Sequence, residues 1–97
     1  MMLVEAVEKF MIACDQTVDH HNQTQSKLYW KLIKEELDEL TRPESDENEL
    51  KELCDLLWVA IGYGLSRGWD VSGAFSEVAR SNMSKVGDDG KGFVKRM

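Results

Sequence analysis

The spacing of hydrophobic and polar residues along the chain predicts four helices and no strand. Apolar residues recur every three or four positions, the period of an amphipathic helix, in four stretches: residues 2–18, 23–41, 45–67 and 70 to about 85. Polar connections separate these stretches, and Pro43, the only proline in the chain, follows the second of them. Helices joined by short connections form bundles, in which ligand and metal sites lie between facing helices. The pattern therefore predicts an all-α, four-helix bundle.

The third predicted helix is apolar on two sides. One stripe runs from Leu50 to Leu65, and a second contains Leu56, Val59 and Tyr63. A helix that is apolar on more than one face is buried, so we expect this helix to be central and part of it to form a subunit interface. In the second helix, Trp30 lies off the main apolar stripe. We expect its ring to face a partner chain or a ligand.

The length and charge of the chain limit its possible functions. Ninety-seven residues make one domain, residues 1–97, of a size that is marginal as a monomer. Its last stretch, 87–97, is glycine-rich and is expected to be a flexible tail. The net charge of −6 argues against nucleic acid as a partner, because proteins that bind it carry a basic surface.

The sequence also predicts a soluble, cytoplasmic protein with no membrane partner. The apolar run from Leu53 to Ile61 is interrupted by Asp55 and is too short to span a bilayer. The first residues do not resemble a signal peptide. Cys14 and Cys54 are expected to be free thiols, and neither has the spacing of a zinc site.

Two acidic pairs on successive helices are the candidate chemical site. Glu36 and Glu39 are three residues apart on the second helix, and Glu52 and Asp55 are three apart on the third. This spacing places both members of a pair on one helix face. If the two faces meet, four carboxylates converge, and oxygen ligands of this kind are those that Mg²⁺ and Mn²⁺ prefer.

The alternative is that these acids are ordinary surface residues. Lys51 is four residues before Asp55, and Arg42 is three after Glu39, so either acid could form an ion pair within its helix. Glu36 has no basic residue at helical spacing and lies within the apolar stripe of its helix. A buried carboxylate is costly unless it is paired or binds a metal. The residues alone leave both interpretations open.

The paired motif resembles a known family. Glu35-Glu36-x-x-Glu39, followed after twelve residues by Glu52-x-x-Asp55, is similar to the signature of MazG-like all-α nucleoside triphosphate pyrophosphatases. The stretch from Glu77 to Lys85 is similar to the last helix of small phage and bacterial members. The resemblance covers roughly residues 25 to 90, and the combination of both motifs is more specific than either half alone.

The resemblance implies an activity and roles for individual residues. Members hydrolyse an NTP or dNTP to the monophosphate and pyrophosphate with Mg²⁺, for which Mn²⁺ can substitute, and serve in nucleotide-pool house-cleaning. By position, Glu36, Glu39, Glu52 and Asp55 would be the metal ligands, and Glu35 would bind a further ion or orient the attacking water. Asn82 and Lys85 would hold the phosphates. The family works as homodimers or homotetramers with the site near the interface.

Some assignments stay open. Trp30 is the best candidate to stack on the base. His20 and His21 are further candidates for the base pocket, with the alternative that they are ordinary surface residues. Lys85 and Asn82 could simply be residues near a helix end. Two other functions compete: phosphoribosyl-ATP pyrophosphatase with the same fold, and a non-catalytic acidic helical module that binds a protein partner.

Overall fold

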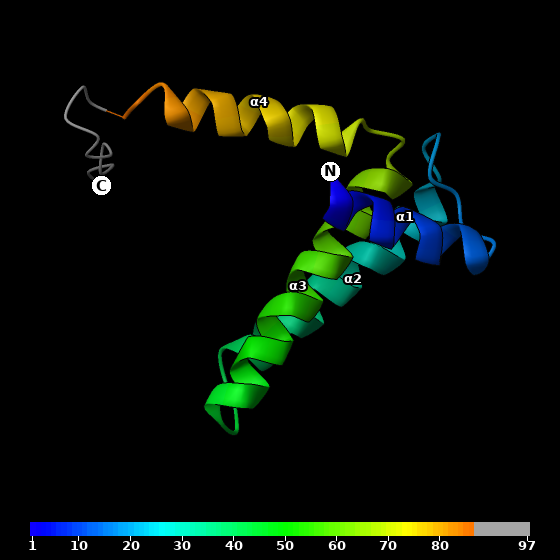
Figure 1. The fold of residues 1–97 in the computed structure, drawn as a ribbon. Helices are drawn as coiled ribbons and strands as arrows, with labels where there is room; N and C mark the ends of the chain where they lie inside the picture. Colours follow the sequence, from blue (N-terminus) through cyan, green and yellow to red (C-terminus); the bar gives the residue numbers. More distant parts are fainter. Residues whose placement is uncertain (87–97) are drawn as a thin grey trace.

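An antiparallel hairpin of two long helices, α2 (Gln23–Leu40) and α3 (Asp46–Ser66), forms the frame of the computed structural model (Figure 1). The structure describes residues 1–86, and the predicted tail at 87–97 lies outside them. α1 (Met2–Ala13) lies across one end of the hairpin, and α4 (Val71–Met83) extends away from it (Figure 1). The described residues form four helices without a strand, which confirms the all-α prediction. None of these helices is long and apolar enough to cross a membrane.

Short polar residues start three of the helices. The side chains of Asn22, Ser45 and Asp70 accept hydrogen bonds from backbone N–H groups in the first turns of α2, α3 and α4. Such N-caps satisfy donors that have no partner within the helix. Ser45 and Asp70 cap α3 and α4 at the positions where the third and fourth predicted helical stretches begin.

α1 is shorter than the apolar pattern predicts. It ends at Ala13, and Asp15 has a φ of 59°, in the left-handed region that ends a helix. The segment that follows forms hydrogen bonds with α2: Thr17 N–H donates to Gln25 Oε1 at 2.9 Å, and Gln25 Nε2 donates to the Thr17 carbonyl at 2.7 Å. The prediction of a helix to residue 18 is wrong because these contacts replace helical hydrogen bonds.

The hydrophobic core lies where α1 covers the hairpin. Its buried apolar residues are Val4, Val7, Met11, Tyr29 and Leu65. Here Tyr29 of α2 packs directly on the backbone of α3, because Gly62 has no side chain: a Cβ at this position would be no more than 2.9 Å from three ring atoms of Tyr29. One turn further, Ser26 Oγ donates to the Ser66 carbonyl at 3.1 Å.

α4 does not pack alongside the other helices, although the sequence predicts a bundle. It buries none of its residues, and Phe75 and Met83 are 53% and 67% exposed. The turn before it contains Gly68, whose φ of 75° directs the chain away from the hairpin. The radius of gyration is accordingly 15.9 Å, larger than the roughly 13 Å of a compact domain of this length.

α3 is central, as predicted, since the other three helices all contact it. One of its apolar stripes nevertheless faces outward: Leu50, Leu53 and Leu57 are all exposed. The fold thus leaves apolar surface on both α3 and α4.

Candidate metal centre

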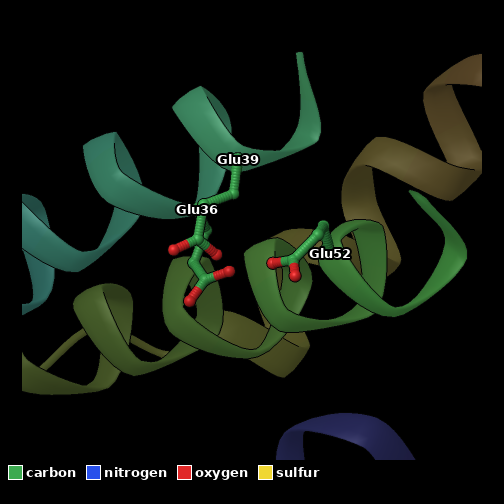
Figure 2. Close-up of side chains that lie close together, drawn as sticks. All are labelled: Glu36, Glu39 and Glu52. Carbon is green, nitrogen blue, oxygen red and sulfur yellow. The ribbon is translucent and has the colours of Figure 1, made fainter. Parts of the chain in front are cut away.

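Three carboxylates converge between the two helices of the hairpin. Glu36 and Glu39 extend from α2 toward Glu52 on α3 (Figure 2). One carboxylate oxygen from each of the three lies within 4.8 Å of the other two. In an antiparallel hairpin, the acids near the end of α2 face those near the start of α3, so the two sequence motifs are brought together.

Two oxygens of this cluster are buried without a hydrogen-bond partner in the described part of the chain. They are Oε2 of Glu36 and Oε2 of Glu52, and the whole Glu52 residue is only 6% exposed. The other oxygen of Glu52 has weak support, from Asn48 Nδ2 at 3.4 Å and Lys51 Nζ at 3.7 Å. A buried, unpaired carboxylate oxygen is costly. These oxygens are hard ligands, so the donor set fits a divalent cation such as Mg²⁺.

The pKa values of the cluster show that its carboxylates repel one another. Burial, then hydrogen bonding to Glu52 and the charge of Glu39, raise the pKa of Glu36 to about 7. Hydrogen bonding to Glu52 also raises the pKa of Glu39. The coupling of Glu52 to Glu39 and then to Glu36, which take up the proton in its place, lowers the pKa of Glu52. The raised pKa of Glu36 therefore places the titration of this carboxyl in the neutral range.

Asp55, the fourth predicted ligand, is not part of this group of three. Its Oδ2 accepts from Lys51 Nζ at 2.8 Å, which is the ion pair that the surface interpretation predicts. Its charge still contributes to raising the pKa of Glu36, so it lies near the cluster. The other predicted pair does not form: Arg42 binds Asp38 and not Glu39.

A cavity of about 380 Å³ opens beside the cluster. Its lining residues are Asp38, Glu39, Arg42, Glu44, Asn48 and Glu52. Asn48 is a neighbour that the acidic motif alone does not reveal, although its position four residues before Glu52 places it on the same helix face. The cluster is therefore open to a small ligand.

The remaining predicted site residues lie outside the cluster. Glu35 is exposed on α2, next to Glu36. Asn82 Nδ2 donates to the Val78 carbonyl within α4 at 3.0 Å, and Lys85 is exposed just after this helix. Since α4 extends away from the hairpin (Figure 1), a single chain does not bring Asn82 or Lys85 to the acids.

Trp30 lies on the same helix as Glu36, about 9 Å before it at the rise of an α-helix. It is 50% exposed, and its ring faces Tyr63 on α3 at 5.9 Å between centroids. It is off the buried stripe of α2, as predicted.

Comparison with protein families gives one match. The model of the phosphoribosyl-ATP pyrophosphohydrolase family matches residues 4–82, from α1 to the end of α4. No curated protein and no solved structure matches the chain. The matched region contains both acidic motifs.

Proposed function

The chain belongs to the phosphoribosyl-ATP pyrophosphohydrolase family, a MazG-like all-α group, and is therefore a nucleotide pyrophosphohydrolase; on this premise, we propose that it hydrolyses an NTP or dNTP to the monophosphate and pyrophosphate. The observation that carries the proposal is the cluster of Glu36, Glu39 and Glu52 with its two buried, unpartnered oxygens. The repulsion within this cluster is explained if its role is to bind a cation.

Glu36, Glu39 and Glu52 would hold Mg²⁺, or Mn²⁺ in its place. Asp55 would become the fourth ligand by leaving Lys51, a rearrangement of one exposed lysine side chain. When bound, the metal neutralises the charge of the phosphates and lowers the pKa of water. Glu35 is next to Glu36 and exposed, where its carboxylate would orient the attacking water.

The substrate would be held by residues from two chains. Asn82 and Lys85 lie on α4, which buries no residue in its own chain. A homodimer or homotetramer would cover the exposed apolar residues of α3 and α4 and would bring these polar groups to the acids of a partner. Trp30 would stack on the base.

Phosphoribosyl-ATP is a second candidate substrate, because the description of the matching family names it. Both candidates contain a triphosphate, so the acidic cluster serves either. The two candidate substrates differ in the group that is attached to the base.

A substrate screen tests the proposal. Pyrophosphate release is measured with Mg²⁺ for the common NTPs and dNTPs and for phosphoribosyl-ATP, with EDTA as the control. We expect metal-dependent release from at least one NTP or dNTP. Release from phosphoribosyl-ATP alone would transfer the assignment to the second candidate. No release from any of them would support the non-catalytic acidic module.

A further inference from the structure

Asn48 lies where the connection between α2 and α3 meets the acidic cluster. It is in the first turn of α3, is half-buried, and lines the same cavity as Glu52, which follows one helical turn later. Neither acidic motif contains Asn48, and the proposed function gives it no role. Its side chain nevertheless contacts both the connection and a proposed metal ligand.

Two hydrogen bonds attach Asn48 to the connection. Its backbone N–H donates to Oγ of Ser45, the N-cap of α3, at 3.1 Å. Its side-chain Oδ1 accepts from the Glu44 N–H at 3.2 Å. Because the second bond is made by the side chain, the connection holds the amide group of Asn48 as well as its backbone.

The bond from Glu44 also determines which end of the amide faces the cluster. An asparagine amide has one oxygen, which accepts hydrogen bonds, and one nitrogen, which donates two. Since Oδ1 accepts from the Glu44 N–H, Nδ2 is directed to Glu52, and it donates to Oε1 of this residue at 3.4 Å. The reverse orientation would set an oxygen against the carboxylate and lose both bonds. The backbone of the connection thus sets the donor toward Glu52.

Glu52 has little else to hold it. Lys51 Nζ is 3.7 Å from the same Oε1 and is closer to Asp55, at 2.8 Å. Oε2 of Glu52 is buried without a partner among residues 1–86. A neutral amide on one oxygen leaves the charge of the carboxylate for a cation, whereas a lysine at this spacing would pair with it, as Lys51 does with Asp55.

We propose that Asn48 is a positioning residue of the metal site. It orients the Glu52 carboxylate through Oε1, leaves Oε2 for the cation, and joins the site to the connection of residues 41–45. The inference rests on the proposed function, in which Glu52 binds Mg²⁺ or Mn²⁺. Hydrogen bonds to a metal ligand fix its orientation, and their loss weakens metal binding about 10–100-fold.

Calorimetric titration of Mn²⁺ into the metal-free protein tests the proposal. Asn48→Ala should bind Mn²⁺ roughly tenfold more weakly than the wild type, at the lower end of this range because the bond to Glu52 is long. Asn48→Leu fills a similar volume without polar atoms and should show the same loss, which keeps the test decisive if the alanine variant folds poorly.

The outcomes separate this inference from the proposed function. Equal Mn²⁺ affinity in the wild type and in both Asn48 variants would overturn the positioning role and leave the metal site in place. A wild-type protein that binds neither Mn²⁺ nor Mg²⁺ would overturn both.

Ser45→Ala is the control for the stability of the helix start. It removes the cap of α3 and should lower the melting temperature in EDTA, but it leaves the Asn48 amide in place and should keep the Mn²⁺ affinity of the wild type. If Ser45→Ala loses as much Mn²⁺ affinity as Asn48→Ala, Asn48 acts only through the stability of this helix end, and the proposal is wrong.

Discussion

The two halves of the α2–α3 hairpin bury different kinds of group: the half that α1 covers buries the apolar core, and the other half buries carboxylate oxygens. In the half that α1 covers, Tyr29 packs on Gly62, and Ser26 binds the Ser66 carbonyl. In the other half, Glu36 and Glu52 each have a buried oxygen without a partner among the described residues. One half therefore supplies the stability that holds the repelling groups of the other half together. The comparison teaches that the unfavourable free energy of burying unpaired carboxylate oxygens is confined to the half where the metal is proposed to bind.

Replacement of Glu52 is the strongest test of this division. Glu52→Gln should lower pyrophosphate release at least about 100-fold, because it removes a buried ligand of the proposed metal. The same variant should unfold at an equal or higher temperature without metal, since a buried unpaired charge is gone. Glu49→Gln, one turn earlier and exposed, is the control and should keep its activity. A Glu52→Gln protein that is active, or is strongly destabilised, would contradict the proposed division between the two halves of the hairpin.

A substitution in the half that α1 covers should instead lower the stability of the fold. Gly62→Ala places a methyl group against the Tyr29 ring and should cost about 1–3 kcal/mol of unfolding free energy. For a chain of this size, the melting temperature would fall by roughly 4–8 °C per kcal/mol. The double variant Gly62→Ala, Tyr29→Leu should recover part of the loss, since it removes the clash. Unchanged melting of Gly62→Ala would show that the helices can separate at no cost.

Between about pH 4.5 and 7, the pH dependence of stability reports on the acidic half. Because the pKa of Glu36 is raised from 4.5 to about 7, the folded state holds a proton that the unfolded state has lost in this range. Stability without metal should therefore fall as the pH rises from about 4.5 to 7, with a slope of at most about 1.4 kcal/mol per pH unit. Melting curves of the wild type and of Glu36→Gln, in EDTA, measure this slope. It should flatten in the variant and also when Mg²⁺ is added to the wild type.

The smallest effect concerns Asp55 and its ion pair. Lys51→Gln frees Asp55 and should leave the melting temperature nearly unchanged, as expected of a surface ion pair. If Asp55 is the fourth ligand, Mg²⁺ should bind a few-fold more tightly to this variant in calorimetric titration. Weaker binding would mean that Lys51 supports the cluster and that Asp55 remains with it.

The sequence predicts what depends on local spacing. The helical stretches and the opposition of Glu36 and Glu39 to Glu52 both follow from periods of three or four residues in a hairpin. Asp55 shows the limit, because its spacing is the same for a ligand as for a partner of Lys51.

Features that depend on the backbone path between helices could not be predicted. The left-handed conformation of Asp15 ends α1 early, and the turn at Gly68 directs α4 away from the bundle. The backbone bridge between His21 and Arg67 joins segments that are 46 positions apart in the printed sequence. Periodicity carries no information on such pairings.

The three clustered acids lie on two helices joined by the short connection of residues 41–45. Closing a loop this short costs little entropy, and contacts that are near in sequence form quickly. The clustered carboxylates are thus brought together by the hairpin, and within residues 1–86 neither α1 nor α4 supplies a member of the cluster. Extra domains could be joined at either terminus during evolution, and the hairpin would carry its acids unchanged into each new arrangement.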